Sequence, residues 1–169
     1  MTNIFVNKTN NKNIAYLFFK NKKISCFVGK NGIGYKKKEG DLITPKGVFK
    51  VVRIFYRPDK LKKIKSGIPT YEIKKYYKWC TDPKNVNYNS LVLKKINCIY
   101  ENLFRDDDLY DLILVLNYNL NKKKYRGSAI FIHCMSEKKK FTEGCIAIKK
   151  EDLRKIIQRL TPLTRFIIN

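Results

Sequence analysis

Two residues of the chain could together carry out nucleophilic chemistry. His133 is the only histidine, and it follows the apolar run 129–132. Cys145 lies twelve residues further on, directly after Gly144, and opens a second apolar run. A thiol becomes a strong nucleophile when an imidazole accepts its proton, so two strand ends that meet here would form a catalytic pair. Gly144 permits a tight turn whose amide N–H groups could face a developing oxyanion.

Both residues also have a structural interpretation. A lone histidine beside a strand is often a structural or merely exposed residue, and a cysteine that opens an apolar run is often a small core residue. Spacing alone leaves this alternative open.

The chain that must position the pair is predicted to be mainly β. Short apolar runs rich in branched and aromatic residues indicate strands over 14–19, 24–28, 47–55, 112–117, 129–133, 145–148 and 165–168. A helix is predicted over 151–160, because its apolar residues recur at helical spacing and Thr161-Pro162 ends it. Residues 58–110 show no clear period, so long loops that wall a cleft are expected there.

Length and composition indicate a single domain over residues 1–169. With 44% hydrophobic and 13% aromatic residues, the chain can bury one substantial core, which excludes a disordered protein. The first 20 residues lack the features of a signal peptide, and no apolar run approaches the roughly 20 residues that cross a bilayer. We therefore expect a cytoplasmic protein without membrane contact, whose five cysteines stay reduced.

The formal charge of +23 raises the question of a polyanionic partner. The basic residues are mostly Lys, however, and Arg, the preferred bidentate reader of phosphate, is scarce. Solvated surface charge is therefore favoured, no nucleic-acid partner is expected, and a non-catalytic polyanion-binding module is a remote alternative. Three consecutive carboxylates over 106–108 cannot all converge on one ion, so no metal site is predicted.

Several segments together resemble the L,D-transpeptidase catalytic (YkuD-like) family. They are Lys38-Glu39-Gly40-Asp41, Thr44-Pro45-Lys46-Gly47, Trp79-Cys80-Thr81-Asp82, Tyr88-Asn89, Asp108-Leu109-Tyr110-Asp111, the run 126–133 that ends in His133, and the run 142–148 around Gly144-Cys145. Three of these segments are similar in order and spacing to those of the short proteobacterial branch of the family: Trp79-Cys80-Thr81-Asp82, Tyr88-Asn89 and Asp108-Leu109-Tyr110-Asp111. The resemblance covers nearly the whole chain and implies a mainly β fold with a few helices, a β-sandwich or barrel.

The resemblance also implies roles for individual residues. Cys145 would be the nucleophile, His133 its general base, and Gly144 with Glu143 the turn that builds the oxyanion hole, with no cofactor or metal. Residues expected at the substrate are Arg126, Thr142, Trp79, Tyr88 and Asn89. Many family members carry Arg two residues after the cysteine, where this chain has Ala147, and the interval from His133 to Cys145 is short.

The expected activity is that of a cysteine-dependent L,D-carboxypeptidase. It would act on peptidoglycan stem tetrapeptides or recycled muropeptides through a thioester on Cys145. L,D-transpeptidase activity or D-amino acid exchange on the same stem peptides is the alternative. The oligomeric state stays open.

Overall fold

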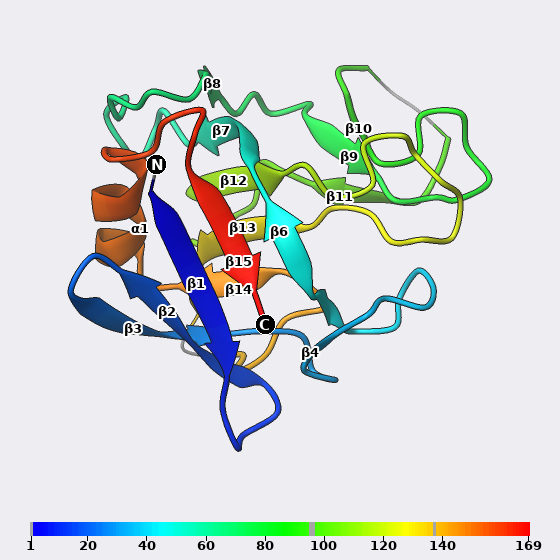
Figure 1. The fold of residues 1–169 in the computed structure, drawn as a ribbon. Coiled ribbons are helices and arrows are strands. Elements are labelled where there is room, and N and C mark those ends of the chain that lie inside the picture. The colour runs from blue at the N-terminus through cyan, green and yellow to red at the C-terminus, as the bar shows by residue number, and fades with distance from the viewer. Residues whose placement is uncertain (1, 95–96, 137) are drawn as a thin grey trace.

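A computed structural model describes residues 2–94, 97–136 and 138–169. Its first strands are β1 (Asn3–Lys8), β2 (Ile14–Phe19), β3 (Lys22–Phe27), β4 (Ile33–Gly34), β5 (Thr44–Pro45), β6 (Gly47–Phe49), β7 (Val51–Tyr56) and β8 (Thr70–Glu72). They are followed by β9 (Lys78–Cys80), β10 (Ser90–Val92), β11 (Tyr100–Asn102), β12 (Leu112–Leu116), β13 (Phe131–Cys134), β14 (Ile146–Ile148), helix α1 (Lys150–Ile157) and β15 (Arg165–Ile168). The described chain is thus mainly β, as predicted (Figure 1).

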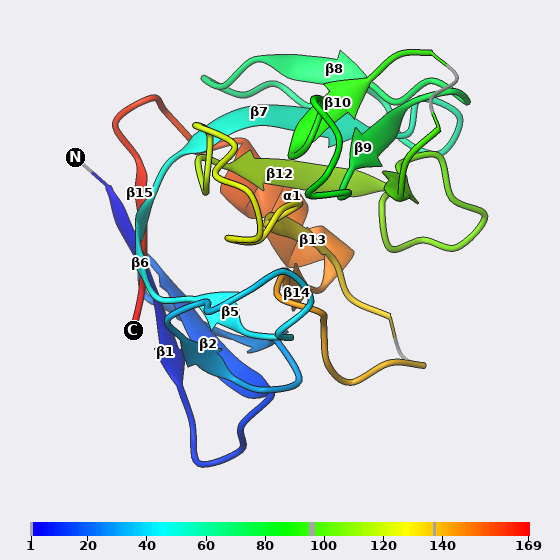
Figure 2. The ribbon, with the colours of Figure 1, turned by 90° about the vertical axis from the view of Figure 1, so that its right-hand side faces the viewer.

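The described strands form a ten-stranded sheet that curls on itself. Its order is β6-β15-β1-β2-β3-β14-β13-β12-β7-β8. Only Lys50 separates β6 from β7 along the chain, yet β6 lies at one edge and β7 lies next to the opposite edge. The two ends of the sheet must therefore approach each other, and Figure 2 shows the chain rising from β6 on one side of the curl into β7.

The main hydrophobic core fills the inside of the curled sheet. Alternate residues of β1 and β2 point inward, as Ile4, Val6 and Leu17 show. Helix α1 packs against β13 and adds Leu153, Ile156 and Ile157 to the core. The helix follows β14 directly, so this packing fixes the segment that begins with Cys145.

A second, smaller core lies on the other face of β7, β12 and β13. The three-stranded sheet β10-β9-β11 covers this face, and its Trp79 packs edge-on against Phe131 at 5.2 Å between ring centroids. The same small core also contains Phe55, Leu103 and Ile113. Both Phe131 and Cys145 therefore belong to the small core, on the face away from α1.

Three sequence predictions need correction. Residues 58–110 do not consist of loops alone, because β8 extends the main sheet and β9, β10 and β11 form the second one. These strands are only three residues long, too short for a visible period of two. Strand β1 was not predicted, since Asn and Lys dilute its apolar alternation. Helix α1 begins one residue earlier than predicted and ends at Ile157, and a turn follows.

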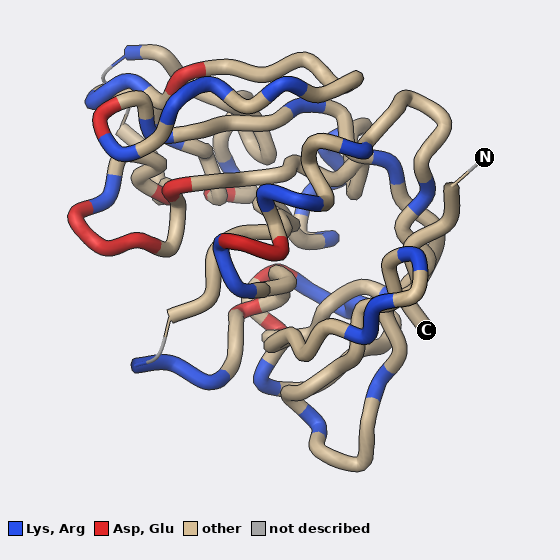
Figure 3. Tube along the Cα trace, turned by 90° about the vertical axis from the view of Figure 1, so that its left-hand side faces the viewer, with Lys and Arg blue, Asp and Glu red and all other residues tan. Residues whose placement is uncertain are grey.

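Basic residues are spread over the surface and do not gather on one element. Figure 3 shows Lys and Arg on loops, turns and strand ends around the described trace. Within the described residues, no helix is long and apolar enough to span a bilayer.

Candidate active site

Strand register brings His133 and Cys145 to one face of the sheet. Strands β13 and β14 are parallel, with Ile132 opposite Ile146 and His133 opposite Ala147. Side chains alternate between the two faces of a strand. The Ile132–Ile146 pair faces the main core, so the residues before and after this pair point to the other face of the sheet. Cys145, His133 and Ala147 accordingly line one cavity of about 300 Å³, together with Thr142, Glu143 and Gly144.

The Cys145 thiol is held by backbone groups at the start of β13. The Phe131 N–H donates to Cys145 Sγ at 3.3 Å, and the thiol donates to the Ala129 carbonyl at 3.1 Å. Ala129 adopts φ 51°, a left-handed conformation that is unusual for a residue with a side chain. The surrounding protein raises the pKa of Cys145 to about 12 through desolvation, which the Phe131 N–H partly opposes. The thiol is therefore protonated at neutral pH.

His133 is held in the tautomer that can accept a proton at Nε2. Its Nδ1 lies 2.8 Å from the Cys134 carbonyl, and because a carbonyl only accepts, Nδ1 carries the proton. The ring also packs edge-on against Tyr110 at 5.3 Å between centroids. Burial lowers the pKa of His133 to about 4, so the imidazole is neutral at pH 7. A neutral thiol and a neutral imidazole thus share the cavity.

Hydroxyl groups fix the turn in front of the nucleophile. The Thr142 hydroxyl donates to the Cys145 carbonyl at 2.6 Å and accepts from the Gly144 N–H at 3.2 Å, while the Thr44 hydroxyl donates to the same carbonyl at 3.2 Å. Gly144 has φ 142°, and a Cβ there would lie 3.0 Å from the Ile43 carbonyl. This turn therefore requires glycine, and the Thr142 hydroxyl is occupied within the loop.

Charged side chains that the sequence did not single out surround the pair. Lys36 lies in the cavity wall, and its buried ammonium pairs with Asp41 and donates to the Ile43 carbonyl at 3.1 Å. Lys139, also in the wall, pairs with Glu143 at 3.1 Å. Further lining residues are Glu39, Glu101, Arg105 and Tyr110. Most of these lining residues were not predicted, because they come from segments in which apolar residues do not recur with a regular period.

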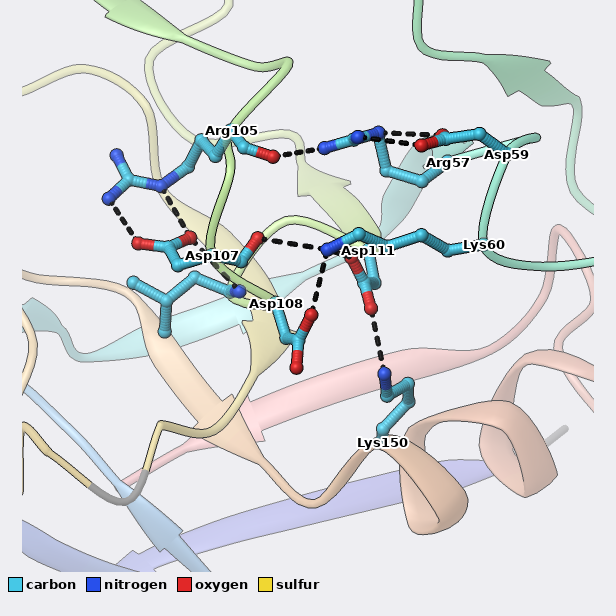
Figure 4. A network of polar contacts seen from close by, with 9 residues as sticks. Arg57, Asp59, Lys60, Arg105, Asp107, Asp108, Asp111 and Lys150 are labelled. Carbon is cyan, nitrogen blue, oxygen red and sulfur yellow. Dashed lines mark hydrogen bonds and ion pairs between the residues drawn. The ribbon is translucent and has the colours of Figure 1, made fainter.

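A network of ion pairs holds the loop after β11 against β7 and α1 (Figure 4). The fully buried Asp111 carboxylate lies 3.1 Å from Lys60 and 2.7 Å from Lys150. Asp108 pairs with Lys60, and Asp107 binds Arg105 with both oxygens, at 2.8 and 2.6 Å.

The same network accounts for two of the three carboxylates over 106–108. Asp107 and Asp108 face cations. Within the described residues, no group of three His, Cys, Asp or Glu could hold a metal ion. The network instead fixes Arg105 and Tyr110 beside His133.

Four residues predicted at the substrate do not line the cavity. Trp79, Tyr88 and Asn89 are buried, and Arg126 lies outside the lining residues. The Trp79 indole N–H and the Ala129 N–H both donate to Asn89 Oδ1, at 3.0 and 3.1 Å. The Tyr88 hydroxyl donates to Glu39. Direct substrate contact by these residues stays a prediction, whereas the contacts seen here support the backbone that binds the thiol.

Comparison with known proteins identifies the family. The profile of the L,D-transpeptidase catalytic domain (YkuD) matches residues 2–168, essentially the whole chain. Neither the curated proteins nor the solved structures gave a match. The matched span includes the β13–β14 pair, the Thr142–Cys145 turn and the cavity described above. The chain therefore belongs to the L,D-transpeptidase catalytic domain family, whose cysteine chemistry acts on peptidoglycan peptides.

Proposed function

We propose that the protein is an L,D-carboxypeptidase that removes the terminal D-amino acid from peptidoglycan stem tetrapeptides. The observation that carries the proposal is that a protonated thiol and a neutral imidazole line one cavity of about 300 Å³. That volume is at the lower end of the range for small-ligand sites, about 300 to 1,000 Å³. The cavity can therefore accept the end of a peptide.

In the first half of the proposed cycle, Cys145 Sγ attacks the carbonyl carbon of the diamino acid. His133 Nε2 takes the thiol proton as the S–C bond forms, and then gives it to the leaving nitrogen as the C–N bond breaks. The D-amino acid departs, and a thioester remains on Cys145. Since the pKa of Cys145 is raised and that of His133 is lowered, proton transfer accompanies the attack and no thiolate stands ready beforehand.

The second half is hydrolysis of the thioester. His133 Nε2 removes a proton from water and the hydroxide oxygen bonds to the acyl carbon. The S–C bond then breaks as His133 returns the proton to Sγ, which restores the thiol and releases a tripeptide. In this cycle the turn at Gly144 would supply the backbone N–H groups that stabilise the oxyanion. The Lys36 ammonium lies near this turn, 3.5 Å from the position of a Cβ built at Gly144, and there it pairs with Asp41.

Transfer to an amine is the competing outcome. A transpeptidase must hold an acceptor amine against the acyl-enzyme and exclude water, which requires a second groove. A tetrapeptide muropeptide offered with excess D-methionine separates the two, with products read by mass spectrometry. Mainly tripeptide supports the proposal, and mainly exchanged or cross-linked product overturns it in favour of transfer. The Cys145→Ala variant controls for contaminating activity.

A cytoplasmic site of action is part of the proposal. It rests on the sequence expectation alone, and it would supply the enzyme with soluble muropeptides at low concentration in place of acceptor strands. Fractionation of cells that express the full chain tests it, and recovery in the cell envelope would contradict it.

A further inference from the structure

Glu101 brings a carboxylate into the cavity of Cys145 and His133. It is the middle residue of β11 and is partly buried. Its Oε2 accepts a hydrogen bond from the Tyr110 hydroxyl at 3.3 Å. Tyr110 in turn packs against the His133 ring, so the carboxylate lies one side chain away from the proposed base. Burial raises the pKa of Glu101, although the Tyr110 hydrogen bond and nearby cations partly oppose this.

The other carboxylates around the cavity have partners within the protein. Asp107 has Arg105, Glu143 has Lys139, Asp41 has Lys36, and Glu39 accepts from the Tyr88 hydroxyl. Glu101 makes no ion pair within 4.0 Å among the described residues, in a chain with 37 Lys and Arg. A partly buried carboxylate without a cation is costly unless something else brings the positive charge.

We propose that Glu101 is a specificity-determining residue that binds the side-chain ammonium group of the diamino acid in the substrate peptide. The inference rests on the proposed function, because that function places a diamino acid at Cys145. An ammonium ion would supply the missing charge and three donors to a carboxylate that already has one donor from Tyr110. A substrate whose amine is blocked would leave Glu101 unpaired.

Ammonium binding would also assist the nucleophile. The negative charge of Glu101 adds to desolvation in raising the pKa of Cys145. Pairing Glu101 with an ammonium neutralises that charge, so the thiol loses its proton more readily when the correct substrate is bound. Removal of the carboxylate should therefore have opposite effects on two reactions: peptide hydrolysis should slow, and alkylation of the free enzyme should accelerate.

The test uses two tetrapeptides that differ only in whether the side-chain amine of the diamino acid is free or acetylated. The unmodified protein should prefer the free amine by about tenfold to a hundredfold in kcat/KM, the range of a charged hydrogen bond. Glu101→Gln keeps the shape and an acceptor for Tyr110, and it should bring the two substrates to within about threefold. Glu151→Gln, on the exposed face of α1, should keep the full preference.

Two further measurements separate this inference from the proposed function. Calorimetric titration of Cys145→Ala with both peptides measures the preference for the free amine as a difference in binding affinity, without turnover. It therefore tests the role of Glu101 even if hydrolysis is absent. Iodoacetamide labelling of Cys145 at pH 7 without peptide should be faster in Glu101→Gln than in the unmodified protein. Equal binding of both peptides, or a Glu101→Gln variant that keeps the preference or labels no faster, overturns the assignment. Amine preference in binding together with a lack of hydrolysis would refute only the carboxypeptidase.

Discussion

His133 and Ala147 are register partners in the parallel β13–β14 pair, so their side chains leave the sheet on the same face. The small side chain of Ala147 keeps the space beside the imidazole open to the cavity. Lys36, Arg105 and Lys139 come from other segments and line the same cavity, and each of them pairs with a carboxylate of the protein.

The first prediction concerns the proposed pair. Cys145→Ala and His133→Ala should each lower kcat/KM by at least about a thousandfold, since one removes the nucleophile and the other its base. Cys134→Ala is the matched control, because Cys134 is adjacent to His133 in sequence but points into the main core. It should keep measurable turnover at some cost in stability. Release of tripeptide from a defined muropeptide is the measurement, and undiminished release by Cys145→Ala would rule out the mechanism.

A second prediction follows from the pKa of His133, which burial lowers to about 4. The chain has one histidine, so its ring protons give a single titration in NMR spectra. That titration should have its midpoint near pH 4, and kcat/KM should fall as the pH drops through the same range because the imidazolium cannot accept the thiol proton. A midpoint near the ordinary value of about 6.5 would contradict the buried, neutral imidazole.

The same lowered pKa predicts how stability depends on pH. Between about pH 6.5 and 4 the unfolded chain binds a proton at His133 and the folded chain does not, so the free energy of unfolding decreases as the pH falls. The full difference is about 3 kcal/mol. Urea denaturation of the protein and of His133→Gln at pH 7 and pH 4 isolates this contribution from the carboxylates. The variant should lose less stability, and an equal loss would count against the prediction.

A fourth prediction addresses the turn before the nucleophile. Thr142→Val removes the hydroxyl that bonds both the Cys145 carbonyl and the Gly144 N–H. Unfolding should become easier by about 1–3 kcal/mol, and kcat/KM should fall by about a hundredfold because the turn is misplaced. Thr142→Ser retains the hydroxyl and should stay within about tenfold of the unmodified protein. Similar losses in both variants would show that the methyl group, and not the hydroxyl, matters.

The sequence predicted His133 and Cys145 as a pair, and the structure places both at one cavity, but the sequence did not predict the residues that surround them. His133 and Cys145 stand out because one is a unique residue type and both adjoin apolar runs that become neighbouring strands. Glu101 and Arg105 were not predicted, because β11 and the loop after it reach the cavity through contacts far apart in sequence. The mainly β class followed from local alternation, whereas the curl of the sheet depends on the pairing of β6 with β15, which no local pattern indicates.

The burial of individual polar and aromatic side chains also could not be predicted from the sequence. Trp79 and Asn89 were expected at the substrate because they belong to the segments that carry the family resemblance, and that expectation stays a prediction. The structure gives each of them internal partners, and the small sheet β10-β9-β11 buries both. Hydrogen-bonding side chains look alike in sequence whether a ligand or the protein itself satisfies them.

The last prediction concerns Asn89, whose side chain connects the small sheet to the thiol. Its Oδ1 accepts from the Trp79 indole and the Ala129 N–H, and its amide donates to the carbonyls of Tyr118 and Asn119. Asn89→Ala would leave these groups unpaired in a buried site, at a cost of about 3 kcal/mol in unfolding free energy.

Asn89→Ala should also affect catalysis. The Ala129 carbonyl accepts from the Cys145 thiol, so a shift of Ala129 would move the nucleophile and lower kcat without changing KM. Asn21→Ala, at an exposed turn, is the control and should stay within about 0.5 kcal/mol and retain full activity. If Asn89 instead contacted substrate directly, the variant would raise KM at unchanged stability, and denaturation together with steady-state kinetics distinguishes the two roles.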